Sequence, residues 1–160
     1  MCREELVELV LRMESEDLPK DAVEIVVVVK KGGDAIVDLR SATGFHGRVF
    51  VDESMALYVA IGAQVMGFEG FVNPRVLRNS ARAKSRGYGG DTRGEGTQLG
   101  GIIVAGPARA AGEDGVCDGE TPNVEYVYIE KEWGDHAPWS EVLAACRSLL
   151  AEDAAREARL

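Results

Sequence analysis

Apolar residues recur at helical spacing near both ends of the chain. The spacing predicts an amphipathic helix from Cys2 to about Met13, with Leu6, Val7, Leu9, Val10, Leu11 and Met13 on one side and Arg3, Glu4, Glu5, Glu8 and Arg12 on the other. A last helix is predicted from Pro138, with Trp139, Val142, Leu143, Cys146, Leu149 and Leu150 on its apolar side. The tail after Ala151 keeps helical propensity but is polar.

Four segments carry strand signals. The β-branched run Val23–Val29 predicts a strand buried on both faces, as in a parallel sheet covered by helices. Arg48–Val51 predicts a short strand, and Ile102–Ala105 predicts another buried one. Val124–Glu130 alternates and, with the strand before it and the last helix, fits a hairpin followed by a packing helix.

The middle of the chain predicts three more helices and two loops. The helices are a short one at Asp34–Ala42, one capped by Asp52 that carries Glu53 in its first turn and runs to about Ile61, and a basic one at Pro74–Arg86. The glycine-rich stretch Gly87–Gly101 and the acidic stretch Pro107–Pro122 predict loops. The glycines before the 102–105 strand miss the dinucleotide-binding spacing and context, which argues against a phosphate loop there.

The resulting order, α-β-α-β-α-α-β-β-α, predicts an α/β sandwich. No internal repeat and no second domain are visible, so we predict a single domain over residues 1–160, with 107–122 as an inserted surface loop and 151–160 as a polar tail.

The net charge of −9 argues against a nucleic-acid-binding protein, because such proteins must neutralise phosphates. The charge is uneven, since residues 73–93 hold six cations and one acid. No apolar run approaches the ~20 residues that span a bilayer, and the first residues do not form a signal peptide. We therefore expect a protein of the cytoplasm or an organelle matrix.

Cys2 is the strongest chemical candidate, because it stands at the start of the first predicted helix. Exposed backbone N–H groups stabilise a thiolate there. Arg3 and the α-amino group add positive charge, whereas Glu4 and Glu5 oppose it. A thiolate can attack a peroxide or a disulfide. The alternative is a terminal cysteine with no redox role.

The other candidates favour structural roles. Cys146 lies on an apolar stripe, where a cysteine acts as a small hydrophobe, and acids around Cys117 disfavour its thiolate. His136 fits a packing or capping role more than an acid–base role, and His46 is expected to be exposed in a turn. Two isolated histidines and scattered cysteines do not indicate a metal site, and we expect no cofactor.

Several segments together resemble the peroxiredoxin-like 2 family of AhpC/TSA-like proteins. They are the stretch Gln98-Leu99-Gly100-Gly101 with the strand that follows, the stretch Glu130-Lys131-Glu132-Trp133-Gly134-Asp135-His136-Ala137, the segment Phe50–Gly62 containing Val51-Asp52 and Leu57-Tyr58, and Cys2-Arg3-Glu4 as the end of a C-x-x-C-R-E motif. Their order and spacing cover nearly the whole chain apart from residues 107–122.

The resemblance implies a thioredoxin-like three-layer sandwich with a mixed sheet. It also implies redox chemistry at Cys2, tuned by Arg3, on a small peroxide or disulfide, with thioredoxin or glutathione as the electron donor. Gln98, Leu99 and Gly100 would form the loop that faces the cysteine, although the proline of a thioredoxin is absent there. A homo-oligomer is compatible with this family.

The resemblance stops inside the C-x-x-C motif, so the first cysteine and an internal strand would precede Met1. We expect a sequence truncated at its N-terminus. Direct pairing of the two flanking strands, or a strand from another chain, are the alternatives, because buried unpaired backbone groups cost about 1–3 kcal/mol each.

Two hypotheses of function follow. The first is a peroxiredoxin-like thiol oxidoreductase that acts through Cys2. The second is a non-catalytic thioredoxin-like interaction module without a working cysteine pair. The basic helix at residues 74–86 could bind an anion such as a glutathione carboxylate, or it could be a solvated face.

Overall fold

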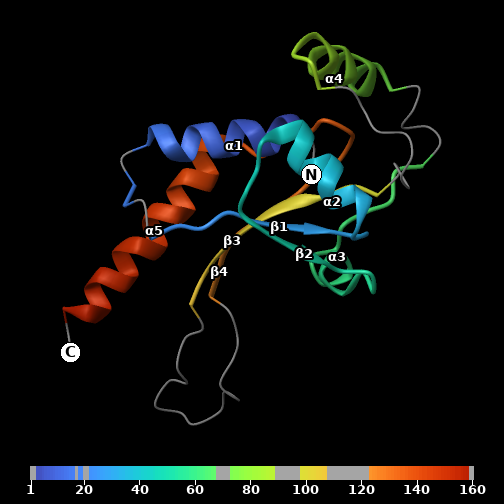
Figure 1. Ribbon diagram of the computed structural model, residues 1–160. Helices are drawn as coiled ribbons and strands as arrows, with labels where there is room; N and C mark the ends of the chain where they lie inside the picture. The colour runs from blue at the N-terminus through green and yellow to red at the C-terminus, as the bar shows by residue number, and fades with distance from the viewer. Residues whose placement is uncertain are drawn as a thin grey trace. The chain divides into compact units, whose positions relative to one another are not determined.

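The computed structural model describes residues 3–16, 18–19, 22–67, 73–88, 98–107 and 123–158 (Figure 1). In chain order the elements are α1 (Arg3–Ser15), β1 (Val26–Val29), α2 (Asp34–Thr43), β2 (Arg48–Val51), α3 (Ala56–Ala60), α4 (Pro74–Ser85), β3 (Gly101–Gly106), β4 (Asn123–Ile129) and α5 (Trp139–Glu157). The order of the elements and the α/β class predicted from the sequence are therefore confirmed.

The elements divide into two compact units. The first unit comprises Met1–Gly101 with Ile129–His136, and the second comprises Ile102–Tyr128 with Ala137–Leu160. The strands form two separate two-stranded sheets, β1 with β2 and β3 with β4. Whether the chain forms one domain stays a prediction.

A parallel strand pair forms the first sheet, with Val26 opposite Arg48 and Val29 opposite Val51. The core on this sheet is built from Leu6 of α1, Val27 of β1 and Phe45 after α2. Partly buried side chains surround it: Val10, Ile25, Val29, Leu39 and Val49. The connection between the strands reverses at Gly44, whose φ of 68° suits a residue without Cβ.

Asp52 positions the short helix α3 at the end of β2. Its carboxylate accepts hydrogen bonds from the backbone N–H groups of Ala56 at 3.0 Å and Leu57 at 2.8 Å. These bonds satisfy donors that have no partner within the helix. The predicted capping role of Asp52 is confirmed, but Glu53 lies before the helix, not in its first turn.

A second core cluster supports the basic helix α4. It joins Val76 of α4 to Met66 and Leu99, with Trp133 packed against it. Asn73 caps α4 by accepting a hydrogen bond from the N–H of Arg75 at 2.9 Å, and Pro74 occupies the first helical position. Local sequence signals thus fix the start of this helix.

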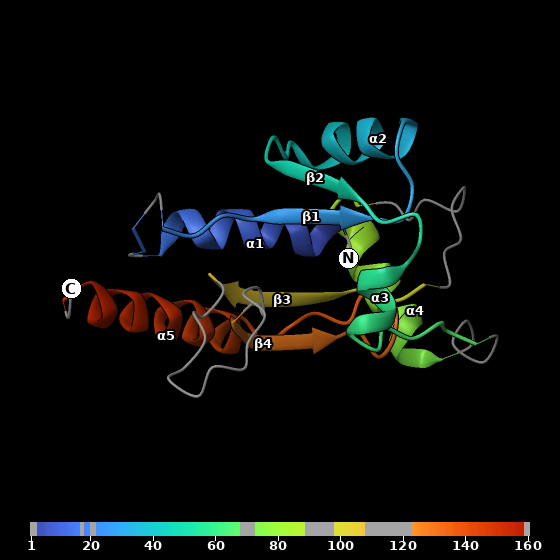
Figure 2. The same ribbon diagram turned by 90° about the horizontal axis from the view of Figure 1, so that it is seen from below.

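In the second unit, β3 and β4 run in opposite directions, as the arrows in Figure 2 show. Helix α5 follows and buries Val142, Leu143, Ala145, Cys146 and Leu149. The predicted apolar side of this helix and the buried position of Cys146 are confirmed. The helix also continues through the polar residues to Glu157.

Three sequence predictions of burial are wrong. β1 is shorter than the run Val23–Val29 and is not buried on both faces, because Val26 is 39% exposed and only Val27 is buried. Most of β3 is half-buried, not buried. Both strands lie in two-stranded sheets. Such a sheet buries a β-branched run less than the large, helix-covered sheet that these runs usually indicate. Glu4 and Glu5, predicted on the polar side of α1, are buried.

Most of the predicted loop at residues 107–122 lies outside the described residues. Among the residues described, no helix is both long enough and apolar enough to span a membrane.

Leu6 and Leu11 on α1 provide a matched test of the first core. Leu6 is fully buried and Leu11 is 59% exposed. We expect Leu6→Ala to lower the free energy of unfolding by about 2–5 kcal/mol, because it removes transfer energy and leaves a cavity. Leu11→Ala should change it by less than about 0.5 kcal/mol. Urea unfolding measures both, and equal losses would contradict this core.

Candidate functional site

The start of α1 is where the sequence places the chemistry. Cys2 lies outside the described residues, and Arg3 is the first residue of α1 and is half-buried. The α1 helix has 13 residues, so its aligned peptide dipoles give its first turn partial positive charge. The predicted roles of Cys2 and Arg3 stay predictions, and the surroundings of this helix start are described next.

A fully buried carboxylate lies in the first turn of α1. Glu4 has no exposed surface, and its two oxygens contact guanidinium groups of the basic helix. Oε1 is 2.9 Å from Nη1 of Arg86, and Oε2 is 3.4 Å from Nη2 of Arg82. Arg86 also pairs with Glu8, one turn further along α1. Glu4 and Glu8 are four residues apart on α1, and Arg82 and Arg86 are four residues apart on the basic segment. Side chains at this spacing lie on one face of a helix.

His136 completes this group from the segment that precedes α5. Its Nε2 is 3.4 Å from Nη2 of Arg82 and 3.7 Å from Oε2 of Glu4, and its Nδ1 is 3.7 Å from Oε2 of Glu8. We call Glu4, Glu8, Arg82, Arg86 and His136 the charge cluster. All five belong to the first compact unit.

The imidazole of His136 is shifted toward its neutral form. Its side chain is 18% exposed, and this burial is the largest cause that lowers its pKa. The Arg82 guanidinium lowers the pKa further. Glu4, Glu8 and Glu130 act in the opposite direction without cancelling the shift. With a neutral imidazole, the cluster has two carboxylates balanced by two guanidinium groups.

Hydrogen bonds fasten the segment that carries His136 to α4. Arg82 donates to the carbonyl oxygen of Gly134 at 2.9 Å, and Asn79 donates to the carbonyl oxygen of Trp133 at 3.1 Å. Gly134 has a φ of 69°, and a Cβ there would lie 2.9 Å from the Cβ of Asn79. A glycine is therefore required for this close approach. This close packing is a physical reason for the glycine at position 134, which lies within the stretch Glu130–Ala137 that contributes to the family resemblance.

The segment Gln98–Gly100 packs beside the same helix. Leu99 is buried with Val76 of α4, and its N–H donates to the carbonyl oxygen of Gln64 at 3.0 Å. The N–H of Gly100 donates to the carboxylate of Glu130 at 2.9 Å. The structure thus brings the predicted loop to α4. That the loop faces Cys2 stays a prediction.

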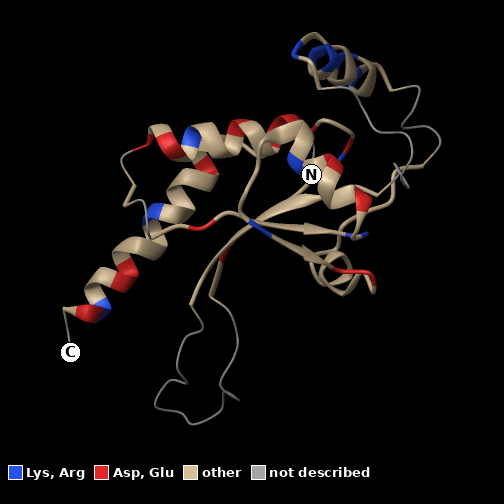
Figure 3. Ribbon diagram, in the orientation of Figure 1, with Lys and Arg blue, Asp and Glu red and all other residues tan. Residues whose placement is uncertain are grey.

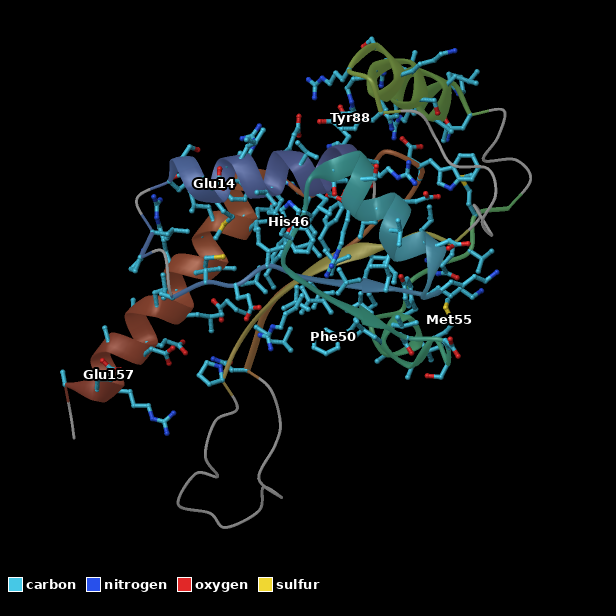
Figure 4. The ribbon with its side chains drawn as sticks, in the orientation of Figure 1. Glu14, His46, Phe50, Met55, Tyr88 and Glu157 are labelled. Carbon is cyan, nitrogen blue, oxygen red and sulfur yellow. The ribbon has the colours of Figure 1, made fainter. Side chains whose placement is uncertain are left out.

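Local sequence patterns do not reveal most of the charge cluster. His136 was expected to pack or cap, and it packs, but into an ionic group and without capping α5. His46, labelled in Figure 4, is exposed as expected. The signal that was available is the pair of acids four residues apart on α1 and the pair of arginines four residues apart on the basic segment. In the described part of the chain, no three His, Cys, Asp or Glu side chains are grouped to hold a metal ion.

Comparison with known proteins gives one family. The model of the AhpC/TSA antioxidant enzymes matches residues 10–111. Peroxiredoxin-like 2A of Danio rerio is 36% identical over 156 residues, which cover 95% of this chain and 64% of that protein. The Bos taurus protein of the same name is 32% identical over 159 residues, which cover 98% of this chain and 65% of the relative. The chain thus spans less than two thirds of the length of these relatives. No solved structure matches it.

The buried charge of Glu4 can be tested against an exposed pair. We expect Glu4→Gln to lower the free energy of unfolding by about 1–3 kcal/mol, because it removes the buried negative charge and one of the two oxygens that accept from the arginines. Glu24 pairs with Arg48 in water, so Glu24→Gln should leave stability nearly unchanged. Urea unfolding of the two variants gives the comparison. A Glu4→Gln variant as stable as the Glu24→Gln variant would contradict a structural role for the cluster.

Acid is expected to destabilise the protein through His136. Because folding lowers the pKa of His136 below 6.5, the unfolded chain takes up a proton before the folded chain does. This contribution to stability is complete above 6.5 and is lost as the pH falls from 6.5 toward the folded pKa. Unfolding measured across this range should show a larger loss in the native chain than in His136→Gln. Parallel pH profiles would contradict the shift.

Proposed function

The chain belongs to the AhpC/TSA antioxidant enzyme family, and on that premise we propose that it is a thiol oxidoreductase that reduces a peroxide or a disulfide through Cys2. The substrate is a small molecule. The electron donor is thioredoxin or glutathione, in the cytoplasm or an organelle matrix. Arg3, beside Cys2, adds positive charge that favours the thiolate.

The pairing of Glu4 with two arginines is the observation that carries this proposal. A carboxylate two residues after Cys2 would oppose a thiolate by like-charge repulsion. Glu4 is held between Arg82 and Arg86, so its negative charge is compensated. The helix dipole and Arg3 then act on the thiol with less opposition. The arrangement suits a reactive cysteine at this end of α1.

The reaction follows from thiolate chemistry. The sulfur of Cys2 attacks the hydroxyl oxygen of a hydroperoxide, an S–O bond forms, the O–O bond breaks, and an alkoxide leaves. The cysteine becomes a sulfenic acid. A donor thiol displaces water from it to form a mixed disulfide, and a second donor thiol then releases the Cys2 thiol as the donor pair is oxidised to a disulfide.

External thiols suit this scheme better than Cys146 does. Cys146 is buried on α5, and burial raises the pKa of its thiol. A buried cysteine with a raised pKa forms little thiolate at neutral pH and is inert. Within the described residues no thiol suits that role, so in this scheme the electron donor supplies the second thiol.

Replacement of the cysteine tests the proposal. Cys2→Ser should lower the rate of hydroperoxide reduction with thioredoxin or dithiothreitol by about a hundredfold or more, because the thiolate is the nucleophile. Cys146→Ala is the matched control and should keep the rate within about twofold. Loss of hydroperoxide over time measures both. A Cys2→Ser variant as active as the native chain, or a native chain with no activity, would favour the non-catalytic interaction module.

A further inference from the structure

Helix α4 and the turn after it form the most strongly cationic segment of an acidic protein. Residues 73–88 hold five of the 18 Lys and Arg residues and none of the 27 Asp and Glu residues. Figure 3 shows α4 with blue segments and no red one. The whole chain has a net charge of −9, so this helix is the place where a negatively charged macromolecule meets the least repulsion.

Four of the five cations in residues 73–88 fall into two groups with different surroundings. Arg82 and Arg86 face α1 and belong to the charge cluster. Arg78 and Lys84 are exposed, and the exposed Leu77 and Ala81 lie between them on the helix surface. We call Leu77, Arg78, Ala81 and Lys84 the outer face of α4. Within the described residues, Arg78 and Lys84 form no ion pair.

We propose that the outer face of α4 is the docking surface for an acidic electron-donor protein that reduces the oxidised Cys2. This proposal rests on the proposed function and names the partner of the same site. Opposite charge would steer the donor to this face, whereas the net negative charge of the chain would disfavour an encounter elsewhere.

The geometry favours a protein surface over a small anion. Arg78 and Lys84 are six residues apart, which corresponds to about 9 Å along a helix. One carboxylate or phosphate pairs with both only when the two long side chains bend toward each other, whereas a protein with several surface acids can pair with each of them separately. Leu77 is 59% exposed between the cations. An apolar side chain with a charged rim is typical of a protein–protein contact.

The same helix segment also connects this surface to the start of α1, which is the end next to Cys2 in the sequence. Arg82 and Arg86 contact Glu4 and Glu8 in the first turns of α1, directly after Cys2 in the sequence. A donor on the outer face would therefore be held by the helix that is bonded to the start of α1. Docking there raises the local concentration of the donor thiol beside Cys2.

Charge reversal with a matched control tests the docking surface. The test variant carries Arg78→Glu and Lys84→Glu. The control carries Lys31→Glu and Arg156→Glu, two exposed cations of other segments with the same total change of charge. At low salt, kcat/KM for a thioredoxin of net negative charge should fall about tenfold or more in the test variant only. Turnover with dithiothreitol, which carries no charge, should be equal in all three proteins.

Direct binding separates this proposal from the proposed function. If the native chain shows no turnover even with dithiothreitol, the oxidoreductase proposal fails. Calorimetry of thioredoxin binding at about 25 and 250 mM salt still tests whether the outer face of α4 binds the donor. Binding that weakens with salt and is lost only in the Arg78→Glu, Lys84→Glu variant supports it. Absence of binding to the native chain, or equal kcat/KM for thioredoxin in all three proteins, overturns it.

A second copy of the chain is the competing occupant. Sedimentation of the native chain and both variants detects it. If the native chain forms a dimer that only the Arg78→Glu, Lys84→Glu variant dissociates, the outer face of α4 belongs to a self-contact and the donor-docking proposal is overturned. A native chain that stays monomeric at assay concentration, with the loss of kcat/KM described above, supports the donor.

Discussion

The burial of one carboxylate, that of Glu4, constrains the first unit of this protein. An ionised carboxylate removed from water costs several kcal/mol unless it is paired and hydrogen-bonded. Glu4 has no exposed surface, so α1 cannot pack in this position unless Arg82 and Arg86 reach it. The requirement ties α4 to α1. Through the bond from Arg82 to Gly134, it also ties the segment before α5 to both.

The same pairing connects the fold to redox chemistry. A helix start stabilises an anionic sulfur, but a free acid in the first turn would work against that effect. Compensation of Glu4 by guanidinium groups removes the part of this conflict that Glu4 causes, while keeping an acid where the helix dipole favours one. His136, with its lowered pKa, adds no full positive charge at neutral pH, so the balance of the cluster depends on the arginines.

Local signals predicted the elements of this chain well. β2 was predicted as Arg48–Val51 and is found there, and α4 begins at Pro74 because Asn73 and Pro74 form a cap whose chemistry is visible in the sequence. Burial was predicted less well. A valine run such as that of β1 indicates a strand, but its cover depends on neighbours that the run does not specify.

The charge cluster could not be predicted from local patterns for the same reason. Glu4 looks like a solvated residue at helical spacing, and its partner Arg82 is 78 positions away along the chain. The sequence placed Cys2 and Arg3 at the start of a helix, and family resemblance gave that position a chemical meaning. The ionic surroundings of the helix start required the tertiary structure.

The rate at which iodoacetamide alkylates Cys2, measured against pH by mass spectrometry, tests the central claim most directly. The account predicts that Arg82→Met shifts the alkylation profile of Cys2 to higher pH than in the native chain, because Glu4 is then less compensated and opposes the thiolate. Arg48→Met, which removes an arginine paired to the exposed Glu24, should leave the profile unchanged. Coincident profiles for the native chain and Arg82→Met would contradict the account.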